Sequence, residues 1–319
     1  MSKATLLDIA KLNGNDTVVG LIEEVIQSAP EAQLVPFRTI RGTTYSTVMR
    51  TGLPSVGFRD ANDGFAPTKS TFKNKLVECY IFGGRIEVDK AVADAHEDGA
   101  EAFQALEASG IMEAALQRFG KQFYYGTVVD GKGFPGLKSV TPKDGVTANS
   151  DPLTVDATGS TATTASSVYA VTLGERDVIG VSGREGAFEM PDFRIGDITG
   201  VNSEKITGYI SEITAWLGLQ MVNENSVRRI INVTADSGKG LTDILLAKLL
   251  ATFPVGKTPS AIMLSRRSRS QLQASRTVVL QGSGRGRPDQ PTMAPLPSEY
   301  DGIPLVVTDS IADNDAINS

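Results

Sequence analysis

The chain has a single cysteine and a single histidine among its 319 residues, and each scarcity excludes a kind of chemistry. Cys79 alone cannot form an intrachain disulfide, which favours a reducing compartment. A Ser-His-Asp triad would have to be built on His96, and a histidine-rich metal site is excluded. We therefore expect no catalytic residues, no cofactor and no metal.

Aromatic residues are sparse, at 6%, and long apolar runs are missing. No stretch approaches the roughly 18 apolar residues that a membrane span needs. Residues 1–14 lack the apolar core of about 7–15 residues that marks a secretory signal peptide. We expect a soluble chain made in the cytoplasm, with no membrane partner. The net charge of −6 argues against a surface that coats nucleic acid, because such surfaces are usually basic.

Glycine and proline, in contrast, are plentiful, with 32 and 15 residues, which implies many turns and a strand-rich chain. Beyond residue 160, strand and helix patterns alternate, which favours an α+β or α/β body. The segment 143–167 has the composition of a loop. We predict strands at 167–174, 177–183, 204–234, 260–265 and 301–311, and helices at 241–253 and 266–276.

Residues 1–36 have the pattern of a short N-terminal arm with two small amphipathic helices. In the second of these, Val18, Ile22 and Val25 fall on one helical face, and Pro30 ends the pattern. An arm of this length is too short to bury a core of its own. It must pack either on the main body or on another subunit.

Residues 37–84 have the pattern of a long β-hairpin. Stretches rich in Thr, Val, Ile and Tyr at 37–58 and 68–88 flank a tip rich in Gly, Pro, Asn and Asp. From residue 37 to 75 there are seven basic and two acidic residues, a balance of +5. The tip sequence at 60–71 begins like a calcium loop, but Phe65 stands at its sixth position and Thr71 at its twelfth. We take it as a plain turn.

An Ala-rich segment at 95–125 predicts a long helix. Its apolar stripe is Met112, Leu116, Phe119 and Phe123, and Gly110 marks either a break or a helix buried on two sides. From residue 76 to 119 there are three basic and nine acidic residues, a balance of −6.

The basic hairpin is thus followed at once by an acidic helix. Two strands alone have no core, so the hairpin needs a surface to lie on. Either the hairpin of one copy covers the acidic helix of the next, or it folds back on its own subunit, and charge alone does not distinguish the two. The candidate contact residues are Arg41, Arg50, Arg59, Lys69, Lys73 and Lys75 on the hairpin, and Glu97, Asp98, Glu101, Glu107 and Glu113 in the acidic region.

Other motifs carry little chemistry. The sequence GVSGR at 180–184 is not a nucleophile elbow, because Arg184 replaces the second glycine. The glycine-rich stretch at 282–288 leads into prolines and not into a helix, so it is better explained as a flexible loop than as a phosphate cradle. The most basic helix of the chain carries Arg266, Arg267 and Arg269. These arginines face either packaged nucleic acid or, as such runs more often do, solvent.

Several segments, in order along the chain, resemble tailed-phage major capsid proteins of the Hong-Kong-97-type fold. The resemblance lies in MRTGLPSVGFRDANDGFAPTKST (49–71), EVDKAVAD (87–94), FYYGT and GFPGLKS within 123–139, and VYAVTLGERDVIGVSG (168–183). It implies an α+β fold with an N-terminal arm at 1–36 and an extended loop at 37–84. It further implies a peripheral domain with a spine helix at 85–140 and 200–236, and an axial domain at 141–199 and 237–319.

The resemblance also implies a structural subunit and not an enzyme. Copies would self-assemble into hexamers and pentamers of an icosahedral head that encloses double-stranded DNA, in a virion assembled in the host cytoplasm. Expected partners are a separate scaffolding protein, a portal, in some heads a decoration protein, and DNA through weak non-specific contact. Some family members crosslink a loop lysine, but exposed lysines usually only solubilise. The rival interpretations are an encapsulin-like nanocompartment shell, a soluble α/β hydrolase and a monomeric binding module.

Overall fold

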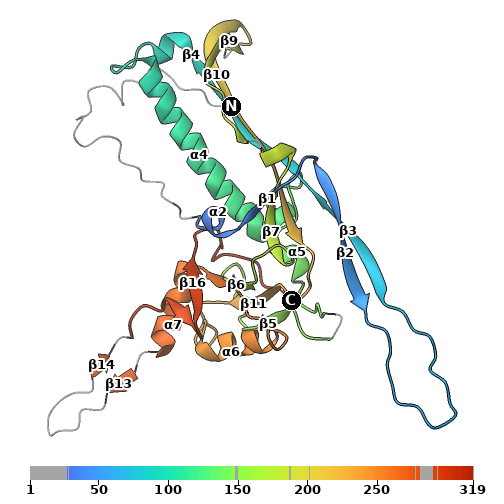
Figure 1. The fold of residues 1–319 in the computed structure, drawn as a ribbon. Coiled ribbons are helices and arrows are strands. Elements are labelled where there is room, and N and C mark those ends of the chain that lie inside the picture. Colours follow the sequence, from blue (N-terminus) through green and yellow to red (C-terminus); the bar gives the residue numbers. More distant parts are fainter. Residues whose placement is uncertain are drawn as a thin grey trace.

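The computed structural model describes residues 27, 29–147, 150–186, 188–200, 202–276, 278–280, 290–292 and 294–318. Two sheets, one long helix and a projecting hairpin make up this part of the chain (Figure 1). The two helices predicted for the N-terminal arm fall in a stretch that lies almost wholly outside the described residues. Of the arm, the structure describes a short helix, α2 (Glu31–Leu34).

The first sheet is organised around one long strand, β10. This strand runs for 17 residues and pairs antiparallel with β4 over ten positions, from Gly208 opposite Asp89 to Leu217 opposite Tyr80. The other edge of β10 pairs along its length with three shorter strands, β9, β8 and β7, and β1 pairs with β7 to extend the sheet. The members are β1 (Phe37–Thr39), β4 (Tyr80–Asp89), β7 (Val178–Ser182), β8 (Phe188–Glu189), β9 (Arg194–Thr199) and β10 (Lys205–Met221).

The second sheet has the order β15-β16-β12-β6-β11-β5. Its central strands are buried along their whole length, as expected for strands covered on both faces. The two arginines of β11, Arg228 and Arg229, are also buried, and they donate hydrogen bonds to the Thr252 carbonyl and the Ser167 hydroxyl. The members are β5 (Thr154–Asp156), β6 (Ser166–Val171), β11 (Val227–Val233), β12 (Ala261–Leu264), β15 (Glu299–Tyr300) and β16 (Ile303–Val307). β5 therefore lies within the segment expected to be a loop, so that expectation is wrong at residues 154–156.

The faces of the second sheet alternate as a strand requires. Val168 and Ala170 of β6 belong to one apolar cluster with side chains of α6 (Asp243–Ala251) and α7 (Arg266–Arg276). Tyr169 and Val171 point to the opposite face and join a second cluster with the end of the long helix. Strands are confirmed within 167–174, 177–183, 260–265 and 301–311, and helices within 241–253 and 266–276, with Pro254 after the end of α6 as expected. The stretch predicted as strand at 204–234 is divided by residues 222–226 into two strands, β10 and β11, of different sheets.

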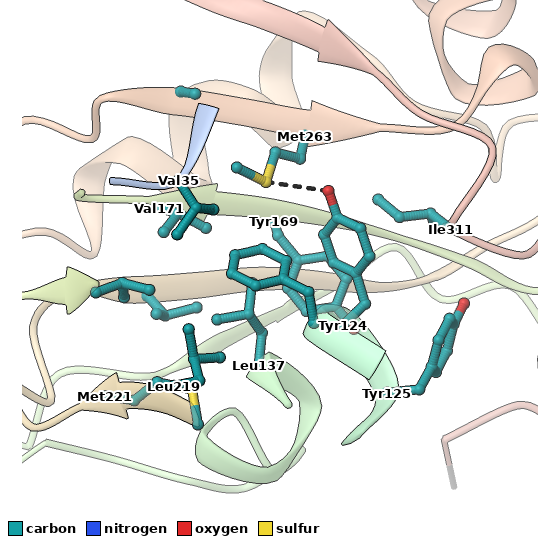
Figure 2. Close-up of a cluster of buried hydrophobic side chains, with 14 of the residues drawn as sticks. Val35, Tyr124, Tyr125, Leu137, Tyr169, Val171, Leu219, Met221, Met263 and Ile311 are labelled. Carbon is teal, nitrogen blue, oxygen red and sulfur yellow. Dashed lines mark hydrogen bonds between the residues drawn. The ribbon is translucent and has the colours of Figure 1, made fainter. Parts of the chain in front are cut away.

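The long helix is α4 (Ala100–Tyr125), which continues through Gly110 and is about 39 Å long at 1.5 Å per residue. It runs beside β4 and β10 in Figure 1, and its C-terminal end enters the core. Figure 2 shows this end, where the Tyr124 hydroxyl oxygen lies 3.1 Å from Met263 Sδ. The Tyr124 ring also lies 5.2 Å from that of Tyr169. In contrast, no side chain from 104 to 118 is fully buried.

Short elements complete the connections between the sheets and the helix. They are α3 (Lys90–Ala93), which precedes α4, the 3-10 turn η1 (Gly126–Val128) and α5 (Leu137–Val140), which follow it, and the 3-10 turn η2 (Arg184–Gly186) after β7. Gly126 ends α4 with φ of 59°, and a Cβ there would lie 2.0 Å from the backbone nitrogen of Gly136. This glycine is therefore required both by its conformation and by its close neighbour.

The sheets divide the chain at residues other than those expected. The axial range 141–199 contains β7, β8 and β9, yet all three pair with β10 in the first sheet. The peripheral range 200–236 contains β11, yet β11 pairs with β5 and β6 in the second sheet. The expected hairpin at 37–84 likewise includes β1 and part of β4, which belong to the first sheet. Strand partners distant in sequence decide these memberships, and local patterns do not reveal them.

One buried carboxyl group joins the arm, the long helix and the C-terminal segment. Glu31 is 0% exposed, and the Tyr124 hydroxyl donates to its Oε1 at 2.7 Å. The Ser310 hydroxyl lies 3.5 Å from Oε2. Burial raises the pKa of Glu31, while hydrogen bonds from Thr308, Tyr124 and Ser310 act in the opposite direction.

The raised pKa of Glu31 predicts a pH-dependent stability. A carboxyl group whose pKa is higher in the folded than in the unfolded chain stabilises the fold below its ordinary pKa of 4.5 and loses that contribution as pH rises through the folded value. Glu31→Gln keeps the acceptor oxygen and cannot ionise. We expect the free energies of unfolding of the two proteins to agree near pH 4 and to diverge in favour of Glu31→Gln toward pH 8, as measured by urea denaturation. Parallel pH profiles would contradict this.

Two glycines of α4 predict opposite responses to alanine. A Cβ at Gly120 would lie 2.2 Å from Ser310 Oγ and 3.0 Å from Glu31 Oε2, whereas nothing lies within 4 Å of one at Gly110. We expect Gly120→Ala to lower the free energy of unfolding by about 1–3 kcal/mol through overpacking. Gly110→Ala should raise it by about 1 kcal/mol through helix propensity. Urea denaturation of both variants tests this, and equal effects would contradict it.

Candidate inter-subunit surface

The hairpin consists of β2 (Thr44–Gly52) and β3 (Thr71–Glu78), and among the described strands these two pair only with each other. Residues 53–70, between them, have no helix or strand and are almost all exposed. In Figure 1 the hairpin projects away from both sheets. The predicted two-stranded element is thus confirmed, with a shorter range than expected.

One face of the hairpin root contacts the chain's own body. Tyr45 is opposite Val77, which is 5% exposed, and the next pair on this face is Thr47 with Lys75. Lys75 Nζ donates to the backbone carbonyl of Met221 at 2.6 Å, and the Tyr45 hydroxyl bonds to Gln220 Oε1. Burial, followed by the nearby charge of Lys73, lowers the pKa of Lys75. These bonds fasten the root of the hairpin to the end of β10.

The opposite face of the hairpin is apolar and exposed. Leu76, Val48 and Phe72 alternate between the two strands at diagonal positions, and their exposed fractions are 58%, 67% and 60%. The Arg50 guanidinium lies over the Phe72 ring at 5.6 Å. Exposed apolar side chains continue into the tip, at Leu53, Val56, Phe58 and Phe65. We call this set the outer face of the hairpin. An apolar patch rimmed by charges is typical of an interaction surface.

The predicted hairpin cations fall into two groups. Arg41, Arg50, Arg59, Lys69 and Lys73 are exposed. None of them forms an ion pair with a described residue, although Arg59 lies over Phe65 at 5.5 Å. Lys75 differs, because its ammonium group is already bound within its own chain. Five of the six predicted cations are thus oriented toward solvent in the single subunit.

The predicted acidic residues do not share one surface. Glu97 and Asp98 lie in the turn before α4, and Glu101 lies in its first turn, and all three are exposed. Glu107 and Glu113 are half-buried. Residues six apart on a helix are rotated by about 240°, so Glu101, Glu107 and Glu113 lie on three different faces. A single neighbouring strand pair can therefore meet the first three together, but not all five.

The arginines predicted for the interior are bound within their own chain. Arg266 pairs with Asp309, Arg267 Nη1 donates to the Asp313 carbonyl at 2.9 Å, and Arg269 Nε donates to the Pro297 carbonyl at 3.0 Å. All three partners belong to the C-terminal segment, between 28 and 46 residues away in sequence. Sequence pattern could not reveal these pairings, because no local spacing marks them.

The structure also places the lone histidine. His96 Nδ1 accepts a hydrogen bond from the backbone of Asp98 at 3.2 Å, and its ring lies 5.8 Å from that of Phe103. In the part of the chain that the structure describes, no group of three or more His, Cys, Asp or Glu could hold a metal ion. Within the same residues, no helix is long and apolar enough to cross a membrane.

The chain that forms this projecting hairpin, long helix and second buried sheet matches the model of a known protein family. The model of the major capsid protein GP7 family matches residues 15–317. This chain belongs to that family. It is therefore a structural capsid protein and not an enzyme, and it forms part of a phage head shell. The hydrolase, the nanocompartment shell and the binding module are not favoured.

Solved structures show the same fold. A chain of the structure of bacteriophage Epsilon15 has 18% identity and a TM-score of 0.72, with 100% of this chain and 98% of that chain covered. The capsid of bacteriophage JBD30 has 11% identity and a TM-score of 0.52, with 97% and 99% covered. At these identities the likeness shows the fold alone, which is the Hong-Kong-97-type fold expected from the sequence. A search of curated proteins found no match.

The two neighbouring lysines of β3 predict different effects on the hairpin. Lys75→Met removes the bond to the Met221 carbonyl and should loosen the root, whereas Lys73→Met removes only an exposed charge. We expect backbone amides of β2 and β3 to exchange hydrogen about 3–10-fold faster in Lys75→Met, consistent with the loss of one charge-assisted hydrogen bond. Hydrogen exchange followed by mass spectrometry of the unassembled capsid protein measures this. Equal acceleration in both variants would contradict the assignment.

Proposed function

We propose that this capsid protein closes rings through its hairpin, and that the outer face of one copy lies over the start of α4 in the next. The observation that carries the proposal is the exposure of an apolar, cation-rimmed surface in the single subunit. Leu76, Val48 and Phe72 are each more than half exposed, although they lie in the ordered part of the hairpin. Covering them removes apolar area from water, at about 25 cal/mol per Å².

Charge supports the choice of the acidic partner surface. The exposed hairpin cations face solvent without an ion pair to a described residue, and Glu97, Asp98 and Glu101 form a compact, exposed acidic group. Opposite charges across an interface set register and partner choice more than affinity. We propose Arg50, which lies on the outer face opposite Phe72, as the cation nearest this contact, with Arg41, Arg59, Lys69 and Lys73 flanking it. Glu107 and Glu113 would lie outside it.

A head-to-tail contact of this kind generates rings. The hairpin and the start of α4 are different surfaces, so the contact is heterologous and closes when its rotation divides a circle. Rings of six and of five copies would then tile the icosahedral head. We propose that the first sheet with α4 forms the peripheral part, and that the second sheet with α6 and α7 forms the axial part around each ring centre.

The remaining partners are proposed on the family resemblance. A separate scaffolding protein would guide assembly in the host cytoplasm, a portal would replace one pentamer, and a decoration protein would bind in some heads. DNA would contact the shell weakly and without sequence preference. Since the guanidinium groups of Arg266, Arg267 and Arg269 are used within the chain, we propose that their first role is to hold α7 against the C-terminal segment.

A charge exchange tests the ring contact. Arg50→Glu and Glu101→Lys should each reduce the yield of rings and shells about tenfold at low salt, because each places like charges opposite one another. The double variant restores opposite charges and should recover most of the yield. The readouts are light scattering and negative-stain microscopy at low and at high salt, where screening should loosen all assemblies of the unaltered protein.

Lys132→Glu, an exposed lysine outside the hairpin, is the matched control and should assemble normally. A double variant no better than either single one would refute the proposed pairing. A compact monomer or dimer of the unaltered protein, indifferent to salt, would refute the ring contact itself.

A further inference from the structure

A groove of about 500 Å³ borders the root of the hairpin. On one side it is lined by residues 47–51 of β2, and on the other by the turns at 175–176 and 222–225. Val48 and Arg50 line this groove and also lie on the outer face of the hairpin, so the two surfaces adjoin along β2. The volume of the groove falls within the range of about 300–1,000 Å³ that ligand sites usually have.

The groove runs along the edge of β2 and not along one of its faces. Five consecutive residues of β2 line the groove. Because consecutive side chains on a strand point to opposite faces, a groove that borders all five must follow the backbone edge of the strand. β2 pairs with β3 on its other edge. No backbone group of residues 47–51 bonds to the backbone of a described residue outside β3. The groove therefore contains an unpaired strand edge, which can accept another strand.

This edge lacks the usual protection against strand addition. Proteins commonly guard an open edge with charges, lysine above all, or with proline. β3 carries Lys73, Lys75 and Glu78, whereas the only charged residue of β2 is Arg50, and β2 contains no proline. The edge that borders the groove is thus the less guarded edge of the hairpin.

The charges around the groove are predominantly positive. Arg38, Arg50 and Arg176 line it, and none of them forms an ion pair with a described residue. The acidic residues in the lining are Glu175 and Glu224. Glu224 lies close enough to Lys75 and Arg228 to affect the pKa of each, so its charge is balanced from within the body. The positive charge left over suits a carboxylate-bearing ligand.

We propose that this groove binds an extended, acidic segment of a second protein, which adds a strand to the edge of β2. Five residues of strand span about 17 Å, and carboxylates at alternate positions of the segment would all face the same side. The densest acidic group of this chain, Glu97, Asp98 and Glu101, lies in a turn and a helix and cannot supply such a strand. The proposal rests on the hairpin but not on the ring contact, because it uses the backbone edge of β2 and the charge of Arg176, which lies outside the hairpin.

Binding of defined peptides to the full-length capsid protein tests the proposal. The first probe is a fluorescent peptide of alternating valine and glutamate, and the second has lysine in place of glutamate. The third is the acidic peptide with alternate backbone nitrogens methylated, so that it cannot complete a strand ladder. By fluorescence anisotropy at low salt, we expect the first probe to bind and both others to bind at least about tenfold more weakly.

Variants of the protein locate the site. Arg176→Glu should weaken binding of the acidic peptide about tenfold, while Lys132→Glu, the same charge change away from the groove, should not. Particle size, measured in parallel, separates this proposal from the ring contact, because Arg176→Glu should still assemble. Equal binding of the methylated peptide, absence of binding, or no effect of Arg176→Glu in folded protein would each overturn the proposal. A photo-crosslinking residue at position 49 gives a further test in assembled particles that contain a second protein. If it captures only this capsid protein, within one copy or between two copies, the proposal is overturned.

Discussion

A two-stranded hairpin has two faces, and when it projects from its own subunit only one of these faces can pack against that subunit. In this chain the inner face of the root is used at once, through Val77, Lys75 and Tyr45. The outer face keeps apolar side chains in water, because Val48, Leu76 and Phe72 are each more than half exposed. An isolated hairpin is marginal in water, so the element is complete only in an assembly. The hairpin therefore needs a covering surface on another subunit, and its root must be fixed to its own subunit.

The long helix provides the fixed point. Its last turns are buried between the two sheets, where Tyr124 contacts Glu31, Tyr169 and Met263 at the junction of the arm, the helix and the second sheet (Figure 2). Its middle is only half-buried, but near its start Phe103 is 1% exposed and packs with Ile86 and Val88 of β4, so α4 is anchored near both ends. Because an α-helix has a regular geometry, its two ends are held at a fixed distance and orientation. The acidic group at its start is thereby presented at a defined place relative to the core.

The sequence predicted the elements far better than their partners. The helix at 266–276 and the hairpin strands followed from local periodicity and turn residues, which are properties of neighbouring positions. Sheet membership did not, because β7 and β11 are both short runs rich in Val and Ile and differ only in which distant strand they pair with. The partners of the basic helix could not be predicted for the same reason, since Arg266 pairs with Asp309, 43 residues away. Period-2 alternation places Lys73 and Lys75 on the same face of the hairpin. Lys75, nearer the root, reaches the Met221 carbonyl, whereas Lys73, farther along the strand, does not.

The mixture of apolar and basic side chains on the hairpin has a physical logic. A purely apolar outer face would gain more from burial, but it would bind any exposed apolar surface and would expose a flat strand pair to aggregation. Cations beside Phe72, Phe65 and Tyr45 keep the unassembled chain soluble, and they penalise every neighbour that does not present carboxylates. In the proposed ring contact such pairs would lie near water, so each would contribute little free energy and the contact would stay reversible while rings form. Errors in ring closure could then dissociate before the apolar side chains are fully covered, so that charge would select the neighbour and apolar burial would retain it.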